Sequence, residues 1–541
     1  MKNKKDRCSQ GRGSLLKYRI SNIKISVSVP DQNKEITRKI KSKISGDINL
    51  YNLVIYKRSI DAREKKNIMY VYTIDFETKK PIKNYQKLGL AIPDEYEYIY
   101  PEKGKKKLLN SPIVCGFGPS GIFSALMLAE NGYNPIIIER GKKILERKED
   151  IKNFWSQGIL NTESNIQFGE GGAGAFSDGK LTTQTKNPRS RKVLEVFVEN
   201  GAPEEILYDS KPHIGTDLLR NVIISIREKI ESLGGTFLFD SKVEEILTDE
   251  NNILQGVIVN GEKIETQVMI IAPGNSSRDT FEMLCKKGVH MTSKPFAVGL
   301  RIEHLQDDVN ESQYGEMREY LGAADYKLTF NGNKRSLYTF CMCPGGYVIN
   351  GASEEDTVVT NGMSYHSRKG ENANSAILVN INPEDFGGDD NVLAGIEFQR
   401  NLEKLAFKHG GSNYKAPVQL AGDFLKDKVS IELGTVKPTI RPGYKFVNFN
   451  DFLPSFISET IKEGLINFSG KMKAFQDENA VLTGIETRSS SPVRIVRKDG
   501  ESTNIAGLFP SGEGAGYAGG IMSAAVDGIV SAEEVIKRYF I

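Results

Sequence analysis

A glycine-rich turn between a short apolar strand and an apolar helix is the feature of this chain that most clearly suggests chemistry. Residues 112–140 read PIVCGFGPSGIFSALMLAENGYNPIIIER, with glycines at Gly116, Gly118 and Gly121 and an acid, Glu139, after the second apolar run. Strand, G-x-G-x-x-G, helix, strand and acid in this order form the fingerprint of a dinucleotide-binding βαβ unit. The first glycine permits the turn, the second lets backbone approach a pyrophosphate, and the third lets helix and strand pack closely.

The start of the helix and the acid would contact different parts of such a ligand. Pro119 and Ser120 open the helix, where free N–H groups and a partial positive charge favour phosphates. Glu139, with Arg140 beside it, can accept hydrogen bonds from ribose hydroxyls, and its charge would repel a 2′-phosphate. The sequence therefore predicts an adenine dinucleotide at this turn. A glycine turn with a purely structural role is the alternative.

Two later segments favour FAD over NAD. The loop FGEGGAGAFSDGKL, residues 168–181, carries five glycines, which allow backbone to approach a flat ring or a ribityl chain. Near its end the chain is again glycine-rich: a strand at 507–510 leads through GEGAGYAGG to a helix from about Ile521. A cofactor site built from the first and last segments is typical of FAD, because a simple dehydrogenase completes its nucleotide domain in one stretch. Beyond the fingerprint, the predicted cofactor-binding residues are Gly171, Gly172, Gly174, Lys180, Leu181, Val243, Ala272, Gly274, Gly512, Glu513, Gly519, Gly520 and Ile521.

Six stretches together resemble one protein family. They read FGEGGAGAFSDGKL, FCMCPGGYVINGASEED, GMSYHSRKGENANSAILV, HGGSNYKAPVQLAGDFL, ETRSSSPVRIVR and GEGAGYAGGIMSAAVDGI. They are similar to bacterial FAD-dependent dehydrogenases of unassigned reaction, within the glutathione-reductase-like superfamily. The resemblance covers most of residues 15–541. It implies bound FAD, a small N-terminal domain and an FAD-dependent protein C-terminal domain, but no particular substrate.

The resemblance also implies roles for three segments. The strand ending in MIIAPGN, residues 269–275, would close over the flavin nucleotide. The N-terminus of the last helix would lie against the O2 edge of the flavin, where its dipole stabilises negative charge on the reduced ring. Glu513 stands where the superfamily usually has an Asp that contacts the ribityl chain.

The cysteine pair Cys341 and Cys343 is a candidate for catalysis. In a regular strand a C-x-C pair puts both sulfur atoms on one face, where they could form a flavin-linked dithiol. Packing of two small apolar side chains is the alternative, and the sequence favours it. The reason is that the chain lacks the C-x-x-x-x-C spacing of flavin disulfide reductases. No cysteine or histidine falls at the paired spacing of a metal site, so we expect no metal.

Lys180 and His366 are the other catalytic candidates. Lys180 could lie near the flavin N1–C2=O edge and favour the reduced ring, and an ion pair with Asp178 is the alternative. His366 has polar neighbours and could be an acid or base, or else a histidine with only structural hydrogen bonds. Arg488 and Arg494 could clamp a substrate carboxylate, with ion pairs inside the domain as the alternative. Glu303 and His304 form a weaker acid–base candidate.

Composition places the chain among ordinary globular proteins. It has 541 residues, of which 39% are hydrophobic and 26% charged, which suggests two or three domains. Five cysteines argue against a disulfide-built secreted protein. No apolar run approaches the ~18 residues needed to span a bilayer, and no apolar stretch follows the charged N-terminus. We expect a soluble cytoplasmic protein with no membrane partner.

The predicted fold class is α/β. It comprises a glutathione-reductase-like, Rossmann-type FAD-binding domain, an inserted α+β cap or substrate domain, and a small N-terminal α+β domain. The predicted divisions are a disordered tail (1–14), a small basic domain (15–100), a linker (101–110), the FAD-binding domain (111–290), the cap domain (291–475) and a return segment of the FAD-binding domain (476–541).

Local patterns predict elements in two regions. In the small domain they indicate strands over 18–29, 53–60 and 67–76, and a helix over 31–44 with Asp31 as its cap. After a helix at 216–233, the chain has the strand signals of a short β-meander, at 236–239, 243–247, 254–259 and 268–271.

The predicted function is hydride or electron transfer between bound FAD and an unidentified small molecule. No second G-x-G-x-x-G follows a strand within residues 150–500. Electrons would therefore come from the organic substrate, from transient NAD(P)H or from a protein partner. A non-catalytic flavoprotein or redox sensor is an alternative.

The charge of the first 110 residues raises a further alternative. They carry 26 basic and 12 acidic side chains, whereas the remaining residues carry 46 and 57. A basic module on an acidic body suggests a polyanionic partner, and hence a flavin-dependent tRNA-modifying enzyme. The module has no aromatic-glycine RNA signature, which makes nucleic acid an unfavoured partner. A solvated, lysine-rich small domain is the simpler explanation of the charge, and the sequence favours it.

Overall fold

The structure of the chain is a computed structural model, which describes residues 15–44, 48–94, 97–182, 187–388 and 390–541. The tail predicted over 1–14 lies outside the described residues. The chain divides into two compact units: one holds the residues up to Glu97 together with 204–212 and 313–322, and the other holds the rest. Both contain helices and strands, which confirms the mixed α/β class.

The N-terminal unit is built on a four-stranded antiparallel sheet with strand order β2-β3-β1-β4. Helix α1 buries Ile36, Ile40 and Ile44, one helical turn apart, in the core of this sheet. The Lys34 N–H donates to Asp31 Oδ1 at 2.9 Å, so the predicted cap is confirmed. The elements are β1 (Leu16–Ser26), α1 (Gln32–Ile44), β2 (Tyr51–Asp61), β3 (Met69–Thr78), the 3₁₀ turn η1 (Tyr85–Leu88) and β4 (Leu90–Ala91).

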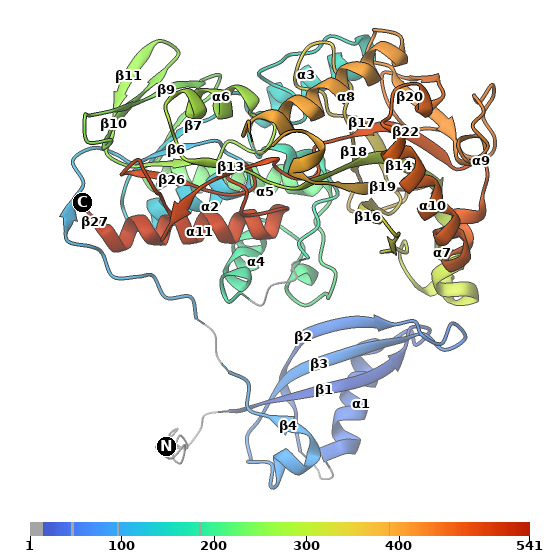
Figure 1. Cartoon of the computed structure of the whole chain (residues 1–541). Helices are drawn as coiled ribbons and strands as arrows, with labels where there is room; N and C mark the ends of the chain where they lie inside the picture. The colour runs from blue at the N-terminus through green and yellow to red at the C-terminus, as the bar shows by residue number, and fades with distance from the viewer. Residues whose placement is uncertain (1–14, 45–47, 95–96, 183–186, 389) are drawn as a thin grey trace. The chain divides into compact units, whose positions relative to one another are not determined.

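The fingerprint lies in a five-stranded parallel sheet of the larger unit. Its order is β26-β12-β6-β7-β8, and every neighbouring pair is parallel. Strands covered on both faces are apolar throughout, which explains the triplets IVC, III and MII. Since β26 comes from near the C-terminus, both ends of the unit contribute to one sheet (Figure 1). The strands are β6 (Ile113–Cys115), β7 (Ile136–Ile138), β8 (Thr236–Leu238), β12 (Met269–Ile271) and β26 (Leu508–Pro510).

Helices cover this sheet, and the first and last of them lie side by side. Helix α2 follows the fingerprint turn, and α11, the last helix of the chain, packs along it (Figure 1). The helices of this region are α2 (Pro119–Glu130), α3 (Ile144–Gln157), α4 (Arg189–Glu199), α5 (Thr216–Ser232), α6 (Arg278–Lys286) and α11 (Ile521–Arg538).

The β-meander differs from the sequence prediction. Only two of the four predicted strands, β9 (Val243–Thr248) and β10 (Leu254–Val259), belong to the three-stranded sheet. Its third strand is β11 (Glu262–Glu265), which the sequence analysis missed because EKIE is mostly exposed and has no apolar alternation. The outer two predicted strands are β8 and β12 of the parallel sheet, so assigning them to the meander was wrong.

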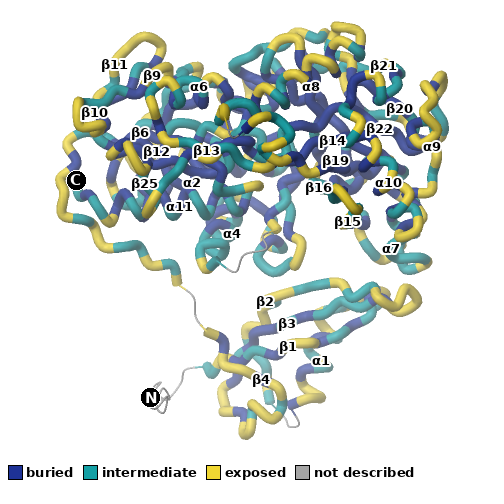
Figure 2. Tube along the Cα trace, viewed as in Figure 1, coloured by how far each residue is buried: buried dark blue, intermediate teal, exposed yellow. Residues whose placement is uncertain are grey.

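A seven-stranded sheet forms the other half of the larger unit, with order β15-β16-β19-β14-β22-β20-β21. Its central strands β14, β19 and β22 are almost entirely buried, as the dark tube in Figure 2 shows. Strand β22 comes from the predicted return segment and pairs with β14 and β20. The strands are β14 (Phe296–Leu305), β15 (Thr329–Asn331), β16 (Ser336–Cys343), β19 (Asn372–Ile381), β20 (Ala416–Leu420), β21 (Tyr444–Phe446) and β22 (Val481–Glu486).

The remaining elements are short strands and the helices around this sheet. The strands are β5 (Lys106–Lys107), β13 (Met291–Ser293), β17 (Tyr347–Asn350), β18 (Thr360–Met363), β23 (Val493–Ile495), β24 (Arg497–Lys498), β25 (Glu501–Ser502) and β27 (Tyr539–Phe540). The helices are α7 (Gln306–Tyr314), α8 (Ala394–Gly410), α9 (Ala421–Leu425) and α10 (Ser455–Lys471).

Candidate functional site

The three fingerprint glycines are required for different reasons. Gly116 has φ +92°, and a Cβ there would clash with the carbonyl of Ala272. A Cβ on Gly121 would clash with the carbonyl of Gly116. A Cβ on Gly118 would meet nothing closer than the Gly172 Cα, at 3.7 Å, so the packing of the chain itself does not demand glycine there. An unfilled position beside exposed backbone suits a phosphate ligand.

Two helices begin at this place without a side-chain cap. Helix α2 follows Gly118 and α11 follows Gly520, and neither capping residue supplies a side-chain hydrogen bond. Uncapped first-turn N–H groups carry a partial positive charge, which attracts anions. A Cβ built on Gly274, Gly519 or Gly520 would meet no heavy atom within 4 Å. These three of the predicted glycines therefore border open space, whereas a Cβ on Gly171, Gly172 or Gly512 would clash with neighbouring protein atoms.

Glu139 ties the fingerprint turn to the glycine loop. Its carboxylate is buried and accepts backbone N–H groups from Phe117 at 2.8 Å, Gly141 at 3.0 Å and Gly169 at 2.9 Å. Two of these donors share Oε1, so Oε2 has one backbone donor and keeps capacity for another hydrogen bond.

Arg140 is held by ion pairs rather than directed at open space. It donates to Glu163 at 2.7 Å and to Asp279 at 2.8 Å, and its guanidinium lies 4.2 Å from the centre of the Phe168 ring. Both carboxylates hold the pKa of Arg140 above its usual value, despite its burial.

The first and last segments are joined by a row of small polar residues. Ser120 Oγ and Ser531 Oγ each lie 2.8 Å from Ser511 Oγ. A Cβ on Gly512 would meet the Ser120 Cβ at 2.7 Å. This close contact brings the turn that carries Glu513 beside the start of α2.

Glu513 is a partly buried acid in this turn. Asn275 Nδ2 donates to its Oε1 at 2.7 Å. Burial, opposed by Lys294 and assisted by the nearby Cys341, raises the pKa of Glu513 to about 7. The carboxyl group is therefore held close to the balance between its neutral and charged forms.

Lys180 and His366, predicted separately, lie in one cluster that is joined by His213. Lys180 forms an isolated β-bridge with His213. The His213 and His366 rings stack with centroids 5.3 Å apart, and His213 Nε2 lies 3.1 Å from the carbonyl oxygen of His366. His366 Nδ1 lies 3.0 Å from the carbonyl oxygen of Ile214, which fixes the ring. Burial and the nearby Arg368 lower the pKa of His213, which favours a neutral imidazole.

The predicted alternative for Lys180, an ion pair with Asp178, is present but long. Lys180 Nζ lies 3.9 Å from Asp178 Oδ2. The carboxylate is instead bound by Arg368, at 2.5 Å, and by the Ser364 hydroxyl. Lys180 therefore keeps an ammonium group that Asp178 only partly neutralises.

The cysteine pair does not lie in a regular strand, so predicting its geometry from strand alternation was wrong. Phe340 pairs with Ala376 and Cys343 pairs with Asn374, so three steps along β16 match two along β19. This is a β-bulge. Cys341 has φ +43°, in the left-handed region.

The residues around this bulge were not predicted from the sequence. Arg301 donates to the carbonyl of Cys341 at 3.3 Å and forms a buried ion pair with Glu486 at 2.6 Å. His213 and Arg368 in the neighbouring cluster were also missed. These residues are far apart in sequence, and no local motif links them.

The arginines considered as a substrate clamp have partners inside the protein. Arg488 donates to Glu403 at 2.8 Å and to Ser353 at 2.6 Å, in agreement with the ion-pair alternative. Arg494 lies with its guanidinium 5.2 Å from the centre of the Tyr517 ring. Glu303 and His304 are buried neighbours on β14.

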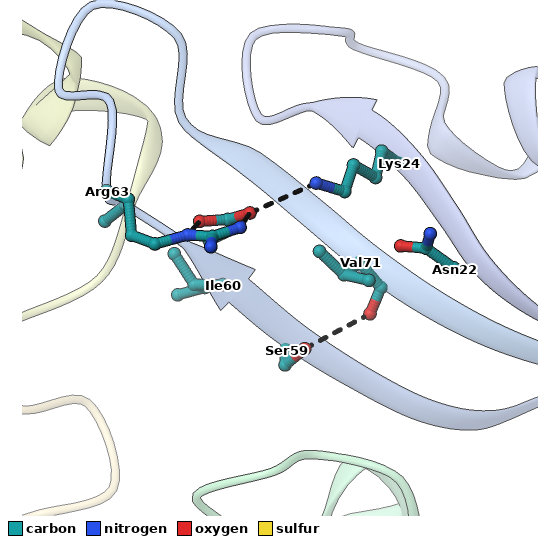
Figure 3. A pocket seen from close by; sticks show the side chains of 8 residues that line it. Asn22, Lys24, Ser59, Ile60, Arg63 and Val71 are labelled. Atoms are coloured by element: carbon teal, nitrogen blue, oxygen red, sulfur yellow. Dashed lines mark hydrogen bonds and ion pairs between the residues drawn. The ribbon is translucent and has the colours of Figure 1, made fainter.

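The N-terminal unit has a surface hollow of about 410 Å³ (Figure 3). Both cations that line it, Lys24 and Arg63, point toward the Asp61 carboxylate, at 3.3 Å and 2.6 Å. An acid that pairs with both cations leaves this hollow poorly suited to a phosphate chain.

Among the described residues, no group of three or more His, Cys, Asp and Glu side chains is arranged to hold a metal ion. In the same part of the chain, no helix has the length and apolarity needed to cross a bilayer.

Comparison with known sequences gives three matches. A family profile described as "FAD-dependent protein, C-terminal domain-like" matches residues 295–489, and one described as "Domain of unknown function (DUF8436)" matches residues 17–77. An uncharacterized protein of Clostridium beijerinckii (strain ATCC 51743 / NCIMB 8052) is 49% identical over 530 residues, which are 96% of this chain and 99% of that protein. Together with the glycine cradle, the first match identifies FAD as the cofactor.

Solved structures show weaker likeness. Glycine oxidase from Bacillus cereus ATCC 14579 is 12% identical with a TM-score of 0.35, over 79% of this chain and 98% of that one. L-amino acid deaminase from Proteus vulgaris is 11% identical with a TM-score of 0.33, over 82% of this chain and 96% of that one. The description of the fold therefore rests on the strand order given above.

Proposed function

Because this chain belongs to the same protein family as the Clostridium beijerinckii protein and carries the matched FAD-dependent domain, we propose that it is an FAD-dependent oxidoreductase. It would transfer hydride or electrons between FAD and a small organic molecule. The observation that carries the proposal is the convergence of two uncapped helix starts with Gly118, Gly274, Gly519 and Gly520, where an added Cβ would meet no heavy atom closer than 3.7 Å.

The nucleotide half of the cofactor is assigned to the fingerprint side. The first-turn N–H groups of α2 would bind the pyrophosphate, with Gly118 and Gly172 allowing close approach. Glu139 Oε2 would accept a hydrogen bond from a ribose hydroxyl in addition to its bond from Phe117. Arg140 would orient this region through Glu163 and Asp279 rather than contact the ligand.

The flavin half is assigned to the C-terminal side, in a glutathione-reductase-like arrangement. FAD, when bound, supplies the hydride chemistry, and the protein binds it and tunes its electronics. The start of α11 would place a partial positive charge near the ring. Glu513, whose pKa is raised to about 7 mainly by burial, would hydrogen-bond the ribityl chain. Lys180 would add a positive charge that Asp178, at 3.9 Å, neutralises only in part.

The paired histidines are assigned to proton handling. His213 is held neutral by burial and by the nearby Arg368, so at neutral pH it would be the unprotonated imidazole, which is the form that a general base requires. His366 is fixed in orientation by its contact with the carbonyl of Ile214. The stacked rings next to Lys180 would therefore give the site a base of defined geometry.

The source of electrons is assigned to the substrate, to transiently bound NAD(P)H or to a protein partner, since no second G-x-G-x-x-G follows a strand within residues 150–500. The test is a spectrum of the purified protein, followed by anaerobic mixing with NADH, NADPH and a panel of small metabolites. We expect flavin absorption bands that bleach with at least one of these reductants. A colourless protein that takes up no FAD would refute the proposal.

A further inference from the structure

The bulge in β16 gives Cys341 and Cys343 a geometry that a regular strand does not have. Successive same-face residues in an extended strand lie nearly two full residue rises apart, which is at the limit for a disulfide. Here an extra residue is inserted between Phe340 and Cys343, and Cys341 adopts φ +43°. The chain is therefore folded back locally, and Cys343 Sγ comes to 3.3 Å from the carbonyl oxygen of Cys341. Both cysteines are free thiols in the structure.

The two thiols have different environments. Cys343 is fully buried, whereas Cys341 is partly accessible. A hydrogen bond from the Cys343 thiol, together with the nearby Lys180 and Arg301, lowers the pKa of Cys341. The same hydrogen bond and burial raise the pKa of Cys343. One accessible thiol of lowered pKa beside a buried thiol of raised pKa is the asymmetry that thiol–disulfide exchange requires.

The charged groups around the pair connect it to the cofactor segments. Lys180 and Glu513 both interact electrostatically with Cys341, and both are predicted cofactor-binding residues. Arg301 and Glu486 form the buried ion pair behind the bulge, and Asp178 acts on Cys343. The cysteines therefore lie within electrostatic range of groups assigned to the flavin half of the site.

We propose that Cys341 and Cys343 form a redox-active dithiol that exchanges two electrons with the bound FAD. As the sulfur–sulfur bond forms, the dithiol loses two electrons and two protons. The electrons and one proton pass to FAD, and the other proton passes to solvent. Cys341 would be the thiol that exchanges with an external disulfide or dithiol. This inference rests on the proposed function, because it needs bound FAD, and it narrows the substrate class to thiols and disulfides.

The test is a reductive titration of the FAD-loaded protein, combined with a count of thiols. Wild-type protein, after mild oxidation, should consume about four electrons per FAD when titrated anaerobically with dithionite, two for the flavin and two for the disulfide. Cys341→Ser and Cys343→Ser should each consume about two. Denatured wild-type samples should show two more free thiols after reduction than before it, and the peptide that contains both cysteines should gain two hydrogens. Dithiothreitol should bleach the wild-type flavin at least tenfold faster than that of Cys341→Ser.

Cys285→Ser is the matched control, because Cys285 lies on α6, outside the bulge. It should behave like the wild type in both measurements. Circular dichroism and FAD content establish that each variant is folded and carries FAD. If a serine variant fails either check, Cys341→Ala takes its place, because loss of either cysteine removes the disulfide. Equal thiol counts in oxidised and reduced wild type, with about two electrons per FAD, would overturn the dithiol and leave the flavoprotein assignment standing. Loss of FAD from the wild type would instead overturn the proposed function.

Discussion

Ser124 Oγ donates a hydrogen bond of 3.0 Å to the carbonyl of Gly528, which joins the helix after the fingerprint to the last helix of the chain. The two helices can approach this closely because Gly528 has no side chain, and a Cβ there would clash with the Ser120 carbonyl. Ser511, which lies 391 residues after Ser120, is also hydrogen-bonded to it, so the C-terminal segment is held against the first βαβ unit. The cofactor site that we propose depends on this junction.

Gly528→Ala should destabilise the protein, although Gly→Ala in a helix usually stabilises it. The added methyl group must displace the Ser120 carbonyl, and overpacking of this kind costs about 1–3 kcal/mol. The midpoint temperature of thermal unfolding and the FAD content of the purified protein should both decrease. Gly470→Ala on α10 is the control, because its Cβ meets nothing within 4 Å, and its stability should stay equal or rise slightly. If both variants had the same stability, the junction would not be as tight as described.

Gly118→Ala and Gly121→Ala should separate cofactor binding from folding. At Gly118 a methyl group has room in the protein but would occupy the space assigned to the pyrophosphate, so the variant should fold and lose most of its FAD. At Gly121 the methyl group clashes with the Gly116 carbonyl, so the variant should unfold more easily or fail to accumulate. Released flavin and denaturant unfolding are the two measurements. Full FAD content in Gly118→Ala would show that the pyrophosphate is assigned to the wrong place.

Contiguous features of the fold could be predicted from the sequence, and features that depend on distant pairing could not. The strands around the fingerprint and the α2 helix are confirmed because glycine spacing and apolar runs act locally. The bulge at Cys341 was not predicted, because it arises from how β16 pairs with β19. Strand β11 is polar and takes its conformation from its neighbour β10.

The same limit applies to the candidate site. Lys180 and His366 could be chosen from their residue types and neighbours, but their connection through His213 spans more than 150 residues and has no periodic pattern. Arg140 could be placed beside the fingerprint, whereas its ion pairs with Glu163 and Asp279 depend on packing. The cofactor roles assigned to the glycines stay predictions until the variants above are measured.

Glu403→Ala should strongly destabilise the protein. Its buried carboxylate pairs with Arg278 at 2.7 Å and with Arg488 at 2.8 Å, and all three side chains are at most 5% exposed. Without the shared carboxylate, two buried guanidinium groups lose an ion-pair partner, and the free energy of unfolding should fall by about 3–5 kcal/mol. Denaturant unfolding measures the loss. Glu478→Ala, which removes the exposed Lys426–Glu478 pair, should leave stability unchanged. Similar losses in the two variants would contradict the buried cluster.

Two adjacent buried groups on β14 should give opposing pH dependences of stability. Burial raises the pKa of Glu303 from 4.5 to about 7, although hydrogen bonds from Thr439 and Asn372 and the charge of Arg301 oppose the shift. Burial also lowers the pKa of His304 from 6.5 to about 4, with Asp477 opposing. The folded state therefore holds the Glu303 proton more tightly than the unfolded state does, and the His304 proton less tightly.

The sign of each contribution follows from these shifts. The stability from Glu303 is fully present below pH about 4.5 and is lost as the pH rises to about 7. The stability from His304 is fully present above pH about 6.5 and is lost as the pH falls to about 4. Between these limits the two slopes largely cancel. Glu303→Gln removes only the first, so its free energy of unfolding should rise with pH across this interval, relative to the wild type, by on the order of a few kcal/mol. Urea titrations at a series of pH values measure the difference, and parallel curves for the two proteins would show that Glu303 is ionised throughout.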